Sequence, residues 1–119
     1  MTTAFDLIFS ALELELGANN NIPVNICKTD NGYEMEFFMA GLVKEDIVVE
    51  YESSVLKVSS QYKAAEKEYL VRTIKDKKYS FAIEIKDIDF ENSTAEYRDG
   101  VLYLTLPKTA SVANRLMLK

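Results

Sequence analysis

The sequence predicts an all-β fold, an antiparallel β-sandwich, and three observations support this prediction. Apolar and polar residues alternate over seven short segments between residues 24 and 106, as expected for half-buried strands. Turn-forming dipeptides separate several of these segments. No long helical segments alternate with the strands, which argues against a βαβ fold. The length of 119 residues fits one domain with a single modest core.

Residues 1–22 predict an N-terminal arm outside the sandwich. Apolar residues recur there at steps of three and four, on one face of a short helix: Phe5, Ile8, Phe9, Leu12 and Leu16. The helix would end near Gly17, and the polar residues 17–21 predict a linker. Because a helix of about 12 residues is marginal in isolation, the arm either packs on its own domain or stays flexible.

The predicted strands cover residues 24–29, 33–40, 46–52, 55–60, 79–86, 94–97 and 101–106. In the fifth strand, one face carries Tyr79, Phe81, Ile83 and Ile85. Hairpin turns are predicted at residues 30–32 and at Asp99-Gly100, with a weaker turn at Ser53-Ser54. Pro23 and Pro107 bracket the strands, because proline favours strand ends. We therefore expect the domain to span residues 23–108.

Two segments fall outside the regular strand spacing. Residues 61–78 interrupt it: residues 61–68 favour a helix or a solvated loop, whereas residues 69–74 favour a strand. An insertion of this size in a compact domain is usually functional. Residues 109–119 are predicted to form an extended C-terminal tail. The tail carries a net positive charge, whereas the N-terminal arm carries a net negative charge.

Composition excludes several classes of enzyme. The absence of histidine rules out Ser-His-Asp and Cys-His relays and the histidine-bearing zinc sites. The four glycines are isolated, so no phosphate-binding loop is present. The carboxylate pairs Glu34/Glu36 and Glu50/Glu52 fit solvated strand faces better than acid–base catalysis, and residues 87–91 lack the pattern of a calcium loop. We expect no enzyme, cofactor or metal site, and a small hydrolase is the least favoured alternative.

Charge and hydropathy narrow the choice of partners. The net charge of −5 and the pI near 4.8 disfavour nucleic acid and anionic lipid. No apolar run is long enough to span a bilayer, and the first residues lack the features of a signal peptide, so the expected compartment is the cytoplasm. The single cysteine, Cys27, is expected on the less buried face of its strand, as a structural thiol.

Two segments resemble the small heat-shock protein (alpha-crystallin) family. Residues 37–52, with Ala40-Gly41-Leu42 before a basic and acidic turn and an isoleucine-valine strand, resemble the early part of the family's domain. Residues 95–108, with Asp99-Gly100-Val101-Leu102 and alternating apolar residues up to Pro107-Lys108, are similar to its closing signature. The resemblance covers about residues 23–108. It implies an immunoglobulin-like β-sandwich, the alpha-crystallin domain.

The resemblance also implies a function, an ATP-independent holdase that captures unfolding client proteins and works as a homo-oligomer built from dimers. The implied client-binding residues are Phe5, Leu7, Ile8, Phe9 and Leu12 of the arm. Residues 61–78 would be the dimerisation loop, through Tyr69, Leu70, Val71 and Ile74. In the tail, Leu116 and Leu118 are similar to the family's anchoring motif and would enter a groove at Val49 and Thr94. The alternative is a CS-domain-like co-chaperone or adaptor, a monomer that binds one folded partner.

Overall fold

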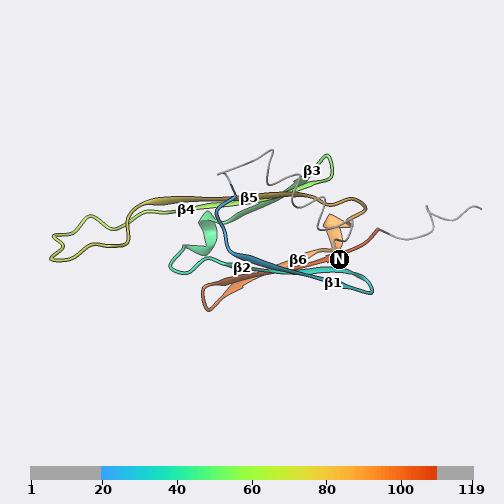
Figure 1. Cartoon of the computed structure of the whole chain (residues 1–119), viewed down its shortest axis with the longest axis horizontal. Helices are drawn as coiled ribbons and strands as arrows, with labels where there is room; N and C mark the ends of the chain where they lie inside the picture. The colour runs from blue at the N-terminus through green and yellow to red at the C-terminus, as the bar shows by residue number, and fades with distance from the viewer. Residues whose placement is uncertain (1–19, 110–119) are drawn as a thin grey trace, which may run out of the picture.

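The computed structural model describes residues 20–109, which fold as two layers of antiparallel strands (Figure 1). The strands are β1 (Val24–Thr29), β2 (Gly32–Phe38), β3 (Val48–Glu52), β4 (Val55–Tyr62), β5 (Lys77–Glu84), β6 (Thr94–Arg98) and β7 (Val101–Pro107). One sheet has the order β1-β2-β7-β6, and the other has the order β3-β4-β5. Two single-turn 3-10 helices, η2 (Lys44–Asp46) and η3 (Phe90–Asn92), precede β3 and β6. The predicted β-sandwich is confirmed.

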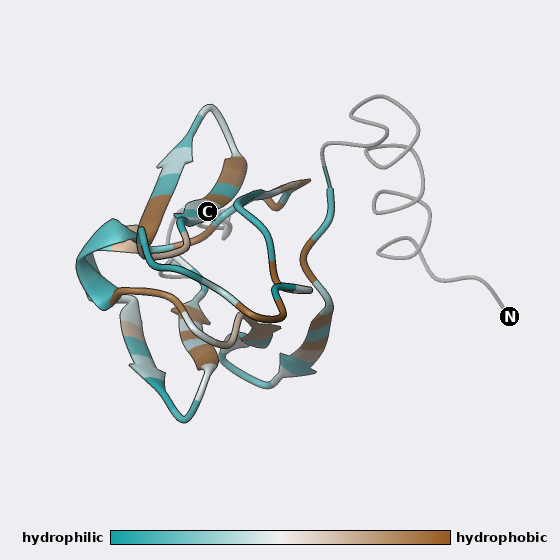
Figure 2. Ribbon diagram, turned by 90° about the vertical axis from the view of Figure 1, so that its left-hand side faces the viewer, coloured by the Kyte–Doolittle hydropathy of each residue, from teal (hydrophilic) through white to brown (hydrophobic). Residues whose placement is uncertain are grey.

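The core lies between the sheets and is built from alternate residues of the strands (Figure 2). In β5, Phe81 and Ile83 are buried and Tyr79 packs against the core, as the alternation predicted. The ring of Phe81 meets that of Phe37 from the opposite sheet edge to face, with centroids 5.2 Å apart. The buried hydrophobic residues of the described range 20–109 are Ile22, Met35, Phe37, Met39, Leu56, Val58, Phe81, Ile83, Ile85, Ile88, Leu102, Leu104 and Leu106.

The hairpin turns lie where the sequence placed them. Asp99 and Gly100 have φ of 53° and 77°, as a type I′ turn between β6 and β7 requires. Ser53 and Ser54 also have positive φ, 51° and 65°, although neither is a glycine. An L-residue in this region carries a steric cost, so the turn between β3 and β4 is less favourable than the turn at Asp99-Gly100.

The strand boundaries differ from the prediction in a few places. The strand predicted over residues 46–52 begins only at Val48, because residues 44–46 form η2. The β4-β5 hairpin is longer than predicted and reaches Tyr62 and Lys77, which pair with each other. The predicted strand at residues 69–74 is absent, because residues 63–76 pair with no strand within the described residues 20–109. Pro23 directly precedes β1, and Pro107 is the last residue of β7.

Candidate functional site

The loop of residues 63–76 extends away from the sandwich beyond the end of the β4-β5 hairpin (Figure 1). Its apolar side chains face solvent: Leu70 is 101% exposed, Val71 78%, Ile74 67% and Tyr69 40%. The four predicted dimer-loop residues therefore lie together on one projecting segment. Large apolar side chains grouped on an exposed loop are typical of an interaction surface.

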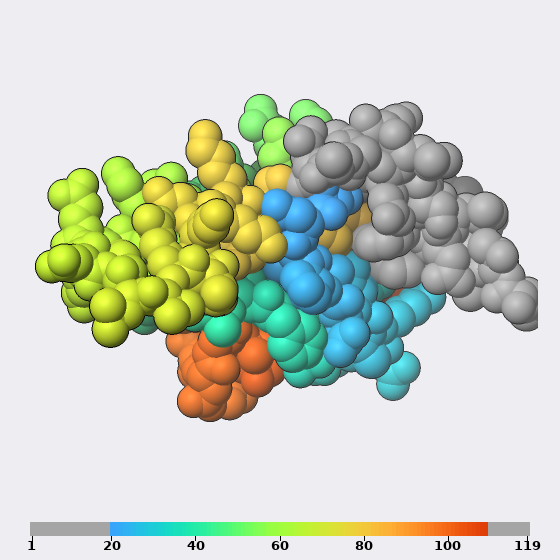
Figure 3. Space-filling view, turned by 60° about the vertical axis from the view of Figure 1, so that its left-hand side comes forward, coloured from blue at the N-terminus to red at the C-terminus, as the bar shows by residue number. Residues whose placement is uncertain are grey.

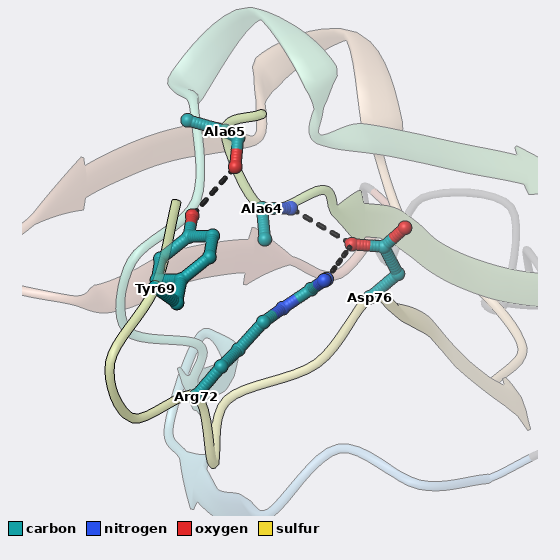
Figure 4. Close-up of polar contacts among 5 residues, drawn as sticks. All are labelled: Ala64, Ala65, Tyr69, Arg72 and Asp76. Carbon is teal, nitrogen blue, oxygen red and sulfur yellow. Dashed lines mark hydrogen bonds and ion pairs between the residues drawn. The ribbon is translucent and has the colours of Figure 1, made fainter. Parts of the chain in front are cut away.

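A set of polar contacts closes this loop at its base (Figure 4). Oδ1 of Asp76 accepts a hydrogen bond from the backbone N–H of Ala64 at 2.8 Å and from Nη2 of Arg72 at 3.2 Å. The Tyr69 hydroxyl donates to the carbonyl of Ala65 at 2.6 Å, and the Arg72 guanidinium lies 5.4 Å from the centre of the Tyr69 ring. We call these five residues the clasp. Sequence reasoning missed it, although Arg72 and Asp76 stand at the i, i+4 spacing of an ion pair.

The two residues predicted to accept the tail lie on different sheets. Val49 is a half-buried residue of β3, where it pairs with Val58, and Thr94 is an exposed residue of β6, where it pairs with Thr105. Both strands stand at the end of their sheet order, so both have an edge without a neighbouring strand. An aromatic pair joins β3 to the turn that precedes β6: Tyr51 of β3 stacks on Phe90 of η3, with ring centroids 5.8 Å apart.

The remaining predicted site residues fall outside the described part of the chain. Those of the arm are Phe5, Leu7, Ile8, Phe9 and Leu12, and those of the tail are Leu116 and Leu118. The start of the tail is fixed, since the Lys108 N–H donates to the carbonyl of Asn31 and the Thr109 N–H to that of Asp87, both at 2.7 Å. Lys108 therefore lies beside the β1-β2 turn and Thr109 beside Asp87.

The sequence did not predict the contact of residues 20 and 21 with β5, because the run 17–21 has the composition of a linker. Asn20 and Asn21, which belong to the polar run 17–21, hydrogen-bond to the outer edge of β5. A run of asparagines gives no periodic signal, so the sequence alone carried no sign of this pairing. These residues complete one sheet edge, whereas β1 at the edge of the other sheet has a neighbour on one side only.

The described residues 20–109 contain no arrangement typical of a catalytic or metal site. No group of three or more histidine, cysteine, aspartate or glutamate side chains could hold a metal ion there. No charged or polar residue of this part of the chain is buried. Glu34 lies exposed on the outer face of β2, and Cys27 is an exposed free thiol on β1, as its alternation predicted. No helix in this range is long and apolar enough to cross a membrane.

Comparison with known proteins gives a consistent result. Residues 25–116 match the model of the Hsp20/alpha crystallin family. The chain is 36% identical over 101 residues to heat shock protein HSP.16.4 of Streptococcus thermophilus, a match that covers 78% of this chain and 70% of the relative. It is 32% identical over 102 residues to the chloroplastic small heat shock protein of Pisum sativum, covering 78% of this chain and 41% of that protein.

Solved structures show the same fold. Heat shock protein 16.0 from Schizosaccharomyces pombe superposes with a TM-score of 0.64 at 21% identity, covering 83% of this chain and 98% of that one. A small heat-shock protein from Xylella fastidiosa gives a TM-score of 0.63 at 21% identity, covering 86% of this chain and 98% of that one.

Proposed function

Because the chain belongs to the Hsp20/alpha-crystallin family, we propose that it is an ATP-independent holdase that works in the cytoplasm as a homo-oligomer built from dimers. In this role it captures unfolding proteins and prevents their aggregation without turning over a substrate. The observation that carries the assembly part is the group of exposed apolar side chains at Tyr69, Leu70, Val71 and Ile74. The solved Xylella fastidiosa relative is described as revealing a distinct high order structure, which supports assembly of this chain as well.

The dimer forms when the segment 69–74 adds to a sheet edge of a second copy. The segment has the composition of a strand, and it pairs with none of the seven strands in the described part of its own chain. Among the four sheet edges of the described domain, that of β5 is occupied by Asn20 and Asn21. We propose that the edges of β3 and β6 receive the tail of a neighbouring subunit. The edge of β1, with its unpaired backbone groups, is left to receive the partner's loop.

The tail links dimers into larger assemblies. In an extended tail, Leu116 and Leu118 point the same way and enter the groove at Val49 and Thr94 of a neighbouring subunit. Residues 109–115 can span about 20 Å when extended, which is enough to cross between subunits. Because each tail contact is weak by itself, subunits can leave the assembly one at a time.

The arm supplies the client-binding surface. Phe5, Leu7, Ile8, Phe9 and Leu12 form an apolar set on a segment too short to be stable as an isolated helix, so it can adapt to many clients. The surplus of acidic over basic residues in the whole chain helps to keep a loaded assembly soluble.

The test combines molar mass by light scattering with suppression of the aggregation of a heated client. We expect an oligomeric wild type, a reduced mass for Leu70→Ser/Val71→Ser, and release of dimers by Leu116→Ala/Leu118→Ala. Glu66→Ser/Lys67→Ser is the matched control, because it changes two exposed polar residues of the same loop and should leave the mass unchanged. A monomeric wild type would contradict assembly and favour the adaptor alternative. Unchanged client aggregation would contradict the holdase activity.

A further inference from the structure

The outer face of the sheet that contains β1 carries a shallow hollow beside the β1 edge, which we call the acidic hollow. It has a volume of about 210 Å³ and crosses three strands, and the outward side chains that line it are Asn25, Cys27, Glu34, Glu36, Tyr103 and Thr105. Neither glutamate forms an ion pair with another residue of the described range 20–109. The acidic hollow therefore presents two carboxylates that lack a cationic partner within this range.

The side chains of this outer face form rows across the strands, because opposite residues of paired strands point to the same side. Three rows reach the β1 edge: an apolar row of Pro23, Phe38 and Val101, a row of Asn25, Glu36 and Tyr103, and a row of Cys27, Glu34 and Thr105. Phe38 of the apolar row is exposed. A strand added at the edge would extend each row by one side chain.

Alternate residues of β1 direct their backbone groups to the open edge. The Phe38 N–H donates to the carbonyl of Pro23, which stands opposite it, so the Pro23 carbonyl faces β2. Because these groups alternate in direction along a strand, Val24, Ile26 and Lys28 face the open edge. An added strand hydrogen-bonds to these three. Its residues opposite positions 25 and 27 then form non-hydrogen-bonded pairs, with side chains on the outer face.

The loop segment 69–74 has two faces when it is extended as a strand. One face carries Tyr69, Val71 and Thr73, and the other carries Leu70, Arg72 and Ile74. On the inner side of β1, Val24 and Ile26 pack against the apolar core. Burying a charge there would be costly, so the face that carries Arg72 belongs on the outer side of the sheet, where the acidic hollow lies.

The acidic hollow offers Arg72 the kind of contacts that it has in its own loop. There the Arg72 guanidinium pairs with the carboxylate of Asp76 and lies over a tyrosine ring. In the hollow, Glu36 and Tyr103 stand opposite each other, and the Tyr103 ring already lies 4.3 Å from one guanidinium, that of Arg98. Because the pair of Arg72 with Asp76 is largely exposed, exchanging it for a carboxylate of another chain costs little.

We infer that the acidic hollow binds the Arg72 side chain of a second copy of this chain, through Glu36, and that this contact sets the register in which segment 69–74 pairs with β1. The inference rests on the proposed addition of that segment to the β1 edge. Figure 3 shows the projecting loop, in yellow-green, well away from the light-blue residues of β1 in its own chain. The contact is therefore made between two copies.

One antiparallel register satisfies these contacts together. Its opposite pairs are Leu70 with Cys27, Val71 with Ile26, Arg72 with Asn25 and Ile74 with Pro23. Arg72 then extends the row of Glu36, and Ile74 extends the apolar row beside Phe38. A shift of two residues would place the charged side chain of Asp76 or of Arg72 in the apolar row, depending on its direction. Charge and hydropathy thus select the same register.

The single cysteine of the chain, Cys27, allows the register to be tested by disulfide trapping. Non-hydrogen-bonded pairs of antiparallel strands have Cα atoms about 4.5 Å apart, which is within the range of a disulfide. Oxidation of full-length Leu70→Cys with copper phenanthroline should therefore link two chains through Cys27, with a yield about tenfold above that of the matched control Arg72→Cys. Non-reducing electrophoresis and peptide mapping measure both yields. An equal or higher yield for Arg72→Cys, or no link to Cys27, would overturn the register.

Charge reversal tests the contact between Arg72 and Glu36. Glu36→Arg should raise by about tenfold the protein concentration at which light scattering first detects monomers, because it sets like charges against each other. Glu36→Arg/Arg72→Glu should restore the wild-type value, since the ion pair forms again with its charges exchanged. Glu45→Arg is the matched control, because it reverses an exposed glutamate of η2 outside the acidic hollow, and it should leave the concentration unchanged.

The outcomes separate this inference from the proposed function. If the wild type dissociates on dilution but Glu36→Arg behaves like it, or if the double variant shows no recovery, the role of the acidic hollow is overturned and the proposed dimer stands. If the wild type is a monomer at every concentration, the proposed assembly fails, and the inference fails with it.

Discussion

The hydroxyl of Tyr97 in β6 donates a hydrogen bond of 2.6 Å to the backbone carbonyl of Met39, just past the end of β2. The same oxygen accepts the N–H of Leu42 at 3.3 Å. One side chain thus satisfies backbone groups on both sides of the bend at Ala40-Gly41. At this bend the chain passes from β2 in one sheet toward β3 in the other. The Tyr97 hydroxyl therefore stabilises a connection between the two sheets that the residues of the bend do not specify by themselves.

Tyr97→Phe should lower the free energy of unfolding by about 1–2 kcal/mol. The substitution leaves the part-buried Met39 carbonyl without its donor and the Leu42 N–H without its acceptor. Urea denaturation followed by circular dichroism measures the change. Tyr103→Phe is the matched control. Tyr103 is a half-buried tyrosine of β7, and its ring, which the substitution keeps, lies 4.3 Å from the guanidinium of Arg98. Equal stabilities of the two variants would contradict the role assigned to the Tyr97 hydroxyl.

Neighbouring phenylalanines of β2 should differ sharply in their effect on stability. Phe37 is fully buried between the sheets, whereas the side chain of Phe38 is 43% exposed on the opposite face. Phe37→Ala should cost about 3–5 kcal/mol through lost burial and a cavity, and Phe38→Ala well under half of that. Thermal and urea unfolding give both values. Similar losses for the two variants would mean that the face assignment of β2 is wrong.

The Ser53-Ser54 turn offers a route to greater stability. Ser54 has φ of 65°, a region that costs an L-residue about 1–2 kcal/mol and glycine far less. Ser54→Gly should therefore raise the free energy of unfolding by about 0.5–1 kcal/mol after the entropic cost of glycine. Ser54→Ala keeps the Cβ atom and should bring no gain. A destabilised glycine variant in the same urea series would refute this account.

The clasp should order the loop without stabilising the domain. Asp76→Ala removes the acceptor of the Ala64 N–H and the ion pair with Arg72. Because both charged side chains are largely exposed, global stability should change by less than about 1 kcal/mol. Exchange of the Ala64 amide and tryptic cleavage after Arg72 should both become faster, and Glu68→Ala in the same loop should alter neither. Unchanged exchange at Ala64 would show that the clasp does not hold the loop.

Much of the fold followed from local patterns. A period of two places Phe81 and Ile83 on one face of a strand, and Asp99-Gly100 has the backbone freedom of a type I′ turn, so neither prediction needed knowledge of the rest of the chain. The same is true of the exposed thiol of Cys27. The dimer-loop role of Leu70 and Val71 came instead from the resemblance to a family, because the local pattern there favoured a strand.

The contacts that decide the surfaces depend on residues far apart in the sequence. Asn21 lies 59 positions from Ser80, and its asparagine run predicted only a linker. The strand predicted at residues 69–74 is absent because a strand needs a partner, and this segment pairs with no strand among the described residues 20–109. Side-chain alternation is a property of the strand itself, and the sequence determined it. Which groups complete each sheet edge depends on where the folded chain brings distant backbone together, and only the tertiary structure decided that.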